Sequence, residues 1–123
     1  RECEDFRDAA GDAITKAILE TCYLTPDEIK LACDIIAEVG LDYAKSYSGQ
    51  FEGPSMEDIL LMIDTLKGTS TKVKIAGVKF PRPQNAYAFL LAGVDLIGTR
   101  AAPTIIDALD QMRQIGLVPA YRG

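Results

Sequence analysis

Two segments of the sequence, Tyr43-Ala44-Lys45-Ser46-Tyr47-Ser48-Gly49 and Lys72-Val73-Lys74-Ile75-Ala76-Gly77, share one pattern. In each, a lysine lies in or at the end of a short apolar run, and a glycine follows within four residues. This pattern is typical of a strand that carries an inward-facing amine to the edge of a parallel sheet. Two such amines on neighbouring strands predict chemistry based on a lysine Schiff base.

The strand signals of these two segments belong to a unit of one strand and one helix that occurs four times. A capping box, Thr25-Pro26-Asp27-Glu28, starts the first helix, and Gly40 ends it. Ser55 is the expected N-cap of the second helix, which ends at Gly68. We expect strands near residues 13–20, 41–45, 72–76 and 94–98, and further helices over Pro83–Ala92 and Pro103–Ile115.

Apolar residues recur at helical spacing in each expected helix, which predicts the faces that pack against the sheet. The expected stripes are Ile29, Ala32, Cys33, Ile36 and Val39 in the first helix, Met56, Leu60, Ile63 and Leu66 in the second, and Ile105, Ile106, Leu109 and Met112 in the last. The segments 38–42 and 91–95 also resemble one another at two junctions between a helix and a strand.

Four strand-helix units repeating every 23 to 30 residues or so match the period of a (β/α)8 barrel. The fold class is therefore α/β, with residues 1–123 forming half of such a barrel. Four units cannot close a barrel, and they would leave the inner face and both edge strands without partners. We therefore expect the chain to be the C-terminal half of a longer barrel, or to pair with another copy as a homo-oligomer or with a separate N-terminal barrel half. The alternative is a small doubly wound domain with helices on both faces.

Composition narrows the function classes. The chain has 123 residues, 48% of them hydrophobic, and a formal net charge of −5, which argues against a nucleic acid or an anionic membrane as partner. We expect a soluble, cytoplasmic protein. Three cysteines without metal-ligand spacing and the lack of any histidine predict no metal site and no cofactor. Proton transfer would then fall to Lys, Asp, Glu, Tyr or water.

Four stretches, in order, resemble deoxyribose-phosphate aldolases: Lys16 to Leu24, Asp42 to Gly49, Val73 to Gly77 and Ala92 to Thr99. The similarity extends over nearly all of the chain but covers only about the C-terminal half of that family's barrel. It implies a class I lyase of nucleoside catabolism, which cleaves 2-deoxy-D-ribose 5-phosphate to acetaldehyde and glyceraldehyde 3-phosphate without a metal. An aspartate of the family's proton relay lies on an earlier strand, which this sequence does not contain.

The resemblance also assigns candidate site residues. Lys45 matches the family's Schiff-base lysine, Lys74 the second lysine that assists it, and Lys16 a further lysine of the same pocket. Physical chemistry supports the first two roles, because a second ammonium about 6 Å away would repel the first by about 2.8 kcal/mol and so lower a lysine pKa. We expect Glu20 to form an ion pair with Lys16 or Lys45, and the alternative is a role as an acid-base group. The candidate phosphate-binding residues are Gly77, Val78, Gly98, Thr99 and Arg100.

Three departures from the family pattern fall at the phosphate end: Val78 replaces a glycine, Lys79-Phe80-Pro81 replaces an arginine or threonine region, and Arg100 replaces a small residue. A fourth, Tyr47, replaces a small residue beside the nucleophile. Tyr47 would narrow the pocket or present a phenol, and Arg100 could hold a carboxylate in place of a phosphate. The sequence therefore leaves three functions open: an aldolase of the deoxyribose-phosphate type, a related lysine-dependent lyase with another acceptor, and a non-catalytic half-barrel.

Overall fold

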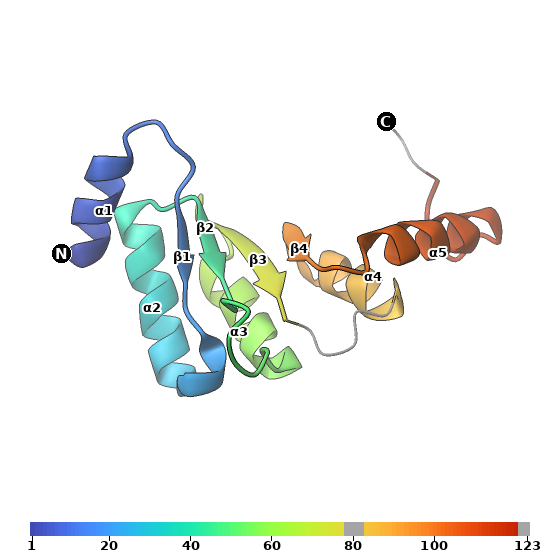
Figure 1. Cartoon of the computed structure of the whole chain (residues 1–123), viewed down its shortest axis with the longest axis horizontal. Coiled ribbons are helices and arrows are strands. Elements are labelled where there is room, and N and C mark those ends of the chain that lie inside the picture. The colour runs from blue at the N-terminus through green and yellow to red at the C-terminus, as the bar shows by residue number, and fades with distance from the viewer. Residues whose placement is uncertain (78–82, 121–123) are drawn as a thin grey trace.

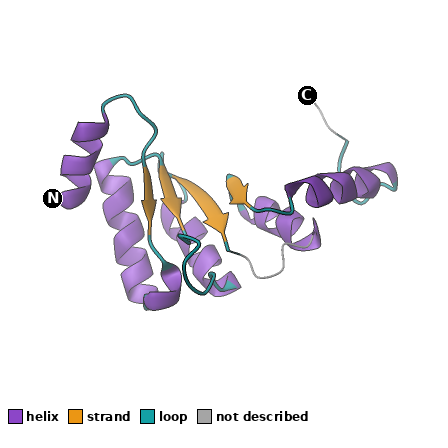
Figure 2. Ribbon diagram, in the orientation of Figure 1, coloured by secondary structure: helices purple, strands orange, loops and turns teal. Residues whose placement is uncertain are grey.

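The computed structural model describes residues 1–77 and 83–120, and Figure 1 shows strands and helices alternating along the chain. Every strand is followed by a helix, as the sequence predicts (Figure 2). The α-helices are α1 (Glu2–Ala10), α2 (Pro26–Val39), α3 (Met56–Leu66), α4 (Pro83–Ala92) and α5 (Ala102–Gln114). The strands are β1 (Lys16–Ile18), β2 (Tyr43–Lys45), β3 (Lys72–Ala76) and β4 (Leu96–Gly98), and a short 3-10 helix, η1, covers Thr21–Tyr23.

The four strands form one parallel sheet in the order β1-β2-β3-β4. Strands that neighbour one another in sequence therefore neighbour one another in space, as in a (β/α)8 barrel. This order, with helices on one face, rules out the doubly wound alternative. Among the described residues, β1 and β4 are edge strands with a neighbour on one side only.

One face of the sheet packs against the helices and forms the core. Ala44, Val73 and Ile75 point to this face and are buried. The core cluster is completed mainly by residues of α2, α3 and α4, namely Ile29, Cys33, Ile36, Ile59, Met62, Leu66 and Phe89, with Leu41 and Val94 from the junctions before β2 and β4. The other face carries the lysines, because side chains alternate along a strand.

Two predicted helix faces were partly wrong. In α3 the buried residues are Ile59, Met62 and Leu66, whereas Met56 is 42% and Leu60 46% exposed. The core-facing residues of α3 are thus Ile59, Met62 and Leu66. Leu60 points away from them and lines an open hollow together with Ala92 at the end of α4. In α5, Ile105 is buried and Ile106 is 58% exposed, because successive helical residues point about 100° apart.

The two similar junctions, residues 38–42 and 91–95, have the same structural role. A buried residue, Leu41 or Val94, follows the glycine that ends each helix. The next residue is an aspartate whose Oδ2 accepts a hydrogen bond from a backbone N–H of the preceding strand segment: Asp42 from Thr15 at 2.8 Å, and Asp95 from Val73 at 2.9 Å. Each aspartate therefore ties the start of its own strand to that of its neighbour.

Three of the strands are shorter than expected: residues 13–15, 19–20, 41–42 and 94–95 lie outside the regular strands. At Thr15 the backbone N–H donates to the carboxylate of Asp42 and not to a carbonyl of a neighbouring strand. Only β3 has the expected bounds, 72–76. Within the described part of the chain, every helix is too short or too polar to cross a lipid bilayer.

Candidate active site

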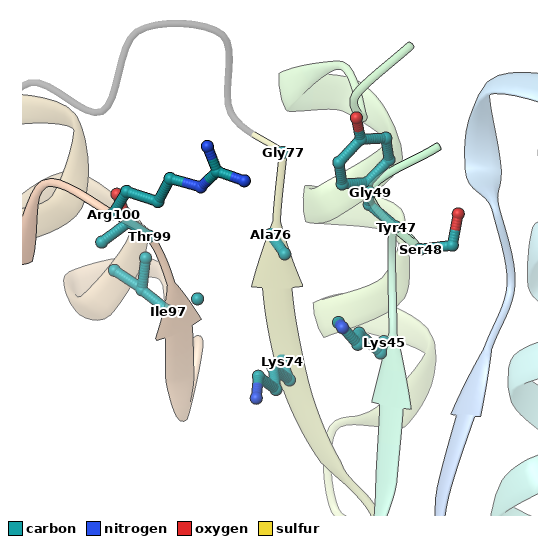
Figure 3. A pocket seen from close by; sticks show the side chains of 11 residues that line it. Lys45, Tyr47, Ser48, Gly49, Lys74, Ala76, Gly77, Ile97, Thr99 and Arg100 are labelled. Atoms are coloured by element: carbon teal, nitrogen blue, oxygen red, sulfur yellow. The ribbon is translucent and has the colours of Figure 1, made fainter. Parts of the chain in front are cut away.

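Lys45 and Lys74 occupy partner positions on β2 and β3. Neighbouring strands lie about 4.8 Å apart, so the two Cα atoms are close and both side chains leave the same face of the sheet. Both lysines are partly buried and line a cavity of about 470 Å³ at the carboxyl end of the strands, seen in Figure 3. The sequence prediction that the two segments bring their amines to one site is therefore consistent with the structure.

Electrostatics single out Lys74. Burial lowers the pKa of Lys74 below the usual lysine value, and the charges of Lys16 and Lys45 lower the pKa further. The predicted mutual repulsion of ammonium groups is present, but desolvation is the larger cause and the lowered pKa is that of the second lysine. Gly98 on β4 assists this burial, because a Cβ built there would lie 3.6 Å from the Cε of Lys74.

Lys16 does not line the cavity. It lies on β1 opposite Tyr43, and its Nζ is 5.5 Å from the centroid of the Tyr43 ring, a cation–π contact. It reaches the site through its charge, which acts on Lys74.

The ion pair predicted for Glu20 was wrong. Among the described residues, the carboxylate of Glu20 contacts neither Lys16 nor Lys45; its Oε2 accepts a hydrogen bond from the backbone N–H of Ser48 at 3.0 Å. The reason is that the backbone of Glu20 leaves the strand geometry and turns the side chain toward the loop after β2.

The loop after Lys45 is held to β3 by Ser46, which is 1% exposed. Its backbone N–H donates to the carbonyl of Lys74 at 3.2 Å. Its hydroxyl lies 3.4 Å from the carbonyl oxygen and 3.3 Å from the backbone nitrogen of Ala76, as donor to the first and acceptor from the second. Sequence reasoning assigned Ser46 no role, because its partner Ala76 lies 30 residues away in the sequence.

Tyr47 covers the end of β3. Its ring lies directly over Gly77, since a Cβ built on Gly77 would be 2.1 Å from Cδ1 of the ring. The phenol donates to the carbonyl of Phe51 at 2.7 Å, which fixes the ring from the other side. Tyr47 therefore narrows the cavity at the end predicted to bind phosphate, as its bulk suggested.

The other predicted phosphate-binding residues lie at β4 and the start of α5. Gly98, Thr99 and Arg100 line the same cavity as the lysines, and so does Gly77 (Figure 3). The Thr99 hydroxyl accepts a hydrogen bond from the N–H of Ala101, the residue just before α5. Val78, the remaining predicted residue, lies outside the described residues.

Comparison with known proteins identifies the family. No protein-family model matches the sequence. A deoxyribose-phosphate aldolase from Brevibacillus brevis is 40% identical over 101 residues, which are 81% of this chain and 45% of that protein. The solved structure of an aldolase called QR15 has a TM-score of 0.79 and 32% identity, and the match covers 94% of this chain and 52% of that one. Over the half of the barrel that it spans, the chain matches the deoxyribose-phosphate aldolase family in sequence and fold.

The chain spans about half the length of the curated deoxyribose-phosphate aldolases that it matches. A tetrameric deoxyribose phosphate aldolase from Aeropyrum pernix shares the fold with a TM-score of 0.78 over 91% of this chain and 49% of that one, at 23% identity. The four parallel strands and their helices thus correspond to half of the barrel of this family.

Sequence reasoning missed part of the cavity wall. Ser48, Gly49, Ala76 and Ile97 line the cavity together with the predicted residues. Ser48 and Gly49 belong to the quoted segment that carries Lys45, so their proximity follows from the chain itself. Nothing in the sequence indicated that Ile97 lines the cavity, because an isoleucine within a short strand is expected to pack in the core.

Proposed function

We propose that this chain carries the lysine half of a class I aldolase site and, in a closed barrel, cleaves 2-deoxy-D-ribose 5-phosphate reversibly to acetaldehyde and glyceraldehyde 3-phosphate. One observation carries the proposal: Lys45 and Lys74 occupy partner positions on neighbouring strands and line one cavity at the carboxyl end of the sheet. This is the end at which barrel enzymes hold their active sites.

Lys45 is the proposed nucleophile. Its amine adds to the aldehyde carbon of the open-chain sugar, and loss of water leaves a protonated imine. A base then takes the proton of the C3 hydroxyl, C3 becomes the aldehyde carbon of glyceraldehyde 3-phosphate, which leaves as the C2–C3 bond breaks, and the electrons of that bond move into the imine to give an enamine. Protonation of the enamine carbon and hydrolysis release acetaldehyde and return the free amine of Lys45.

Lys74 is the proposed proton carrier. A lysine can exchange protons near neutral pH only if its pKa is lowered, and burial together with two neighbouring ammonium groups lowers the pKa of Lys74. Lys16 supports this role through its charge alone. The second lysine of the pair would therefore shuttle the proton between the substrate hydroxyl and the enamine carbon.

Gly77, Val78, Gly98, Thr99 and Arg100 are the proposed phosphate-binding residues. Backbone N–H groups at the end of a strand and at the start of a helix attract a phosphate, and a guanidinium binds one directly. Gly77 and Gly98 lie at the ends of β3 and β4, and Arg100 lines the same cavity. The sugar would lie along the cavity, with its aldehyde carbon at the lysines and its phosphate at these residues.

Activity requires four further strands. In the described ranges 1–77 and 83–120, β1 and β4 each have a strand neighbour on one side only, so a second barrel half would have to pair with them to exclude water from the site. The other four strand-helix units would come from the same chain in a longer protein, from a separate N-terminal half or from a second copy of this chain.

Borohydride trapping tests the proposal. Reducing the imine formed with acetaldehyde would leave an ethyl group on one lysine, which peptide mass spectrometry locates. We expect the ethyl group on Lys45 and none in Lys45→Arg. Lys72→Arg is the matched control, because Lys72 lies on the same strand and face as Lys74 but outside the cavity. Absence of any adduct in the assembled protein would instead support the non-catalytic half-barrel.

A lyase with another acceptor is the second candidate, and the position of Tyr47 favours it. The ring occupies the space over Gly77 where a phosphate would approach the backbone, while Arg100 offers a side-chain cation in the same cavity. Rates of cleavage of phosphorylated and unphosphorylated deoxyribose distinguish the two candidates. Preference for the phosphorylated sugar supports the first, and equal rates support the second.

A further inference from the structure

Glu20 interrupts the pairing of β1 with β2. Leu19 N–H bonds the carbonyl of Lys45 at 2.9 Å, and Thr21 N–H bonds the carbonyl of Ser46 at 3.1 Å. In a regular parallel ladder the second bond would reach two residues beyond Lys45, not one. Glu20 is thus one extra residue on the β1 side, the arrangement of a β-bulge.

The backbone of Glu20 is strained. Its φ of 57° and ψ of 62° are left-handed, and among the described residues it is the one non-glycine with a positive φ. Glutamate has no local preference for this conformation, unlike glycine, asparagine or aspartate. Residues held this way persist only where the surrounding contacts require them, and they cluster at functional sites.

The side chain of Glu20 shows what the strain achieves. One carboxylate oxygen, Oε2, accepts the backbone N–H of Ser48 at 3.0 Å. The other, Oε1, is buried and has no hydrogen-bond partner among the described residues. A carboxylate–amide bond is charge-assisted and stronger than a neutral one. The left-handed turn therefore directs the carboxylate across the end of the sheet onto the loop that follows Lys45.

That loop forms one wall of the cavity. Tyr47, Ser48 and Gly49 line the cavity beside Lys45, as Figure 3 shows. Ser46 ties the start of the loop to β3, and Glu20 ties its middle to the end of β1. The residues directly after Lys45 are therefore fixed from both neighbouring strands.

We propose that Glu20 is a positioning residue, which holds the loop 46–49 and thereby the direction in which Lys45 presents its amine. This inference rests on the proposed function of Lys45 for its catalytic consequence. It does not require Glu20 to touch the substrate, and it assigns the carboxylate a role that the predicted ion pair would not have given it.

Three variants of Glu20 separate the side chain from the backbone. Glu20→Asn and Glu20→Gly accept the left-handed conformation but cannot reach Ser48. Glu20→Gln keeps an oxygen at the right distance. Glu28→Asn is the matched control, because Glu28 also accepts one backbone N–H, that of Thr25 at 2.8 Å, but at the start of α2 and outside the cavity.

Two readouts are needed. In Glu20→Asn and Glu20→Gly we expect hydrogen exchange of the Ser48 amide to rise about tenfold, with a thermal midpoint equal to or above that of the unsubstituted protein. We expect ethylation of Lys45 in the assembled protein to slow about tenfold as well, since misplaced reacting groups lose rate. Glu20→Gln should restore both values, and Glu28→Asn should leave both unchanged.

The outcomes are distinguishable. Unchanged Ser48 exchange in Glu20→Asn would overturn the inference, and so would faster exchange with unchanged ethylation. A lowered thermal midpoint that accounts for slower ethylation would mean that Glu20 only stabilises the fold, and this also overturns it. If unsubstituted protein forms no adduct, the proposed function fails, while the exchange readout still decides whether Glu20 holds the loop.

Discussion

Replacing Gly77 with alanine tests the contact between Tyr47 and the end of β3. Gly77 has a φ of 76°, and a Cβ built there would lie 2.1 Å from Cδ1 and 2.4 Å from Cε1 of the Tyr47 ring. Ordinary contacts begin near 3.4 Å. The ring would have to move by more than an ångström, which would break the hydrogen bond from its phenol to Phe51.

Gly40 provides a matched control for the backbone. Its φ of 80° is nearly the same, but nothing lies within 4 Å of a Cβ built there. Gly40→Ala therefore measures left-handed strain alone, which we expect to cost about 1 kcal/mol. Gly77→Ala adds the displacement of a packed ring, an overpacking cost of about 1–3 kcal/mol, for a total loss of about 2–4 kcal/mol.

Urea unfolding of the two single variants gives both free energies of unfolding. Adding Tyr47→Ala to Gly77→Ala should recover about 1–3 kcal/mol of the loss relative to the sum of the single effects, because the clash needs both side chains. Equal losses in Gly77→Ala and Gly40→Ala, or a strictly additive double variant, would refute the contact and with it the view that Tyr47 closes this end of the cavity.

Three further predictions follow from other parts of the structure. Because the folded state lowers the pKa of Lys74, the free energy of unfolding should rise as pH increases from that lowered pKa toward the ordinary lysine value of about 10.4. Lys74→Met should raise the urea midpoint at pH 7 and remove this rise. Lys30→Met, on the exposed side of α2, should do neither. The hydrogen bonds from Thr15 hold the pKa of Asp42 below its usual range. The contribution of Asp42 to the stability of the fold is therefore present above about pH 4 and is lost as pH falls through the pKa of the folded state. Asp42→Asn should lower the thermal midpoint at pH 7 and weaken the dependence of the midpoint on pH in the acid range. Finally, Ile105→Ala should lose about 2–4 kcal/mol in urea unfolding and Ile106→Ala less than about 1, and a reversed order would mean that α5 packs on its other face.

Local signals in the sequence predicted the elements well. The capping box predicted at Thr25 is formed with Glu28, and α2 ends at Gly40 as expected. Ser55 is the N-cap of α3 as predicted, and the structure adds a reciprocal bond with Asp58 that was not predicted from the sequence. Such signals act within three or four residues, so they can be read from the sequence directly. The repeated unit then determines the order of the strands, because short connections place consecutive parallel strands side by side.

The parts that failed depend on contacts between distant residues. The buried face of α3 depends on how this helix packs against α2 and β3, and the apolar pattern around Met56 and Leu60 fits two faces. The left-handed backbone of Glu20 depends on Ser48, which is 28 residues away and has no pattern in common with it. The position of Lys45 and Lys74 on neighbouring strands was predicted, because consecutive strands lie side by side. The lowered pKa of Lys74 was not predicted for the right reason, because its main cause is burial, which depends on the folded structure and not on a local pattern.

Burial of the lysines also connects closure of the barrel to its chemistry. Desolvation is already the largest cause of the lowered pKa of Lys74, although the inner face of this sheet is open. Four further strands would remove water from that face and strengthen both the desolvation and the repulsion among Lys16, Lys45 and Lys74, since charges interact more strongly in a medium of low dielectric constant. We therefore expect the partner half to supply more than missing residues. By excluding water, it would favour the uncharged form of Lys74 that proton transfer needs, so that assembly and reactivity rise together.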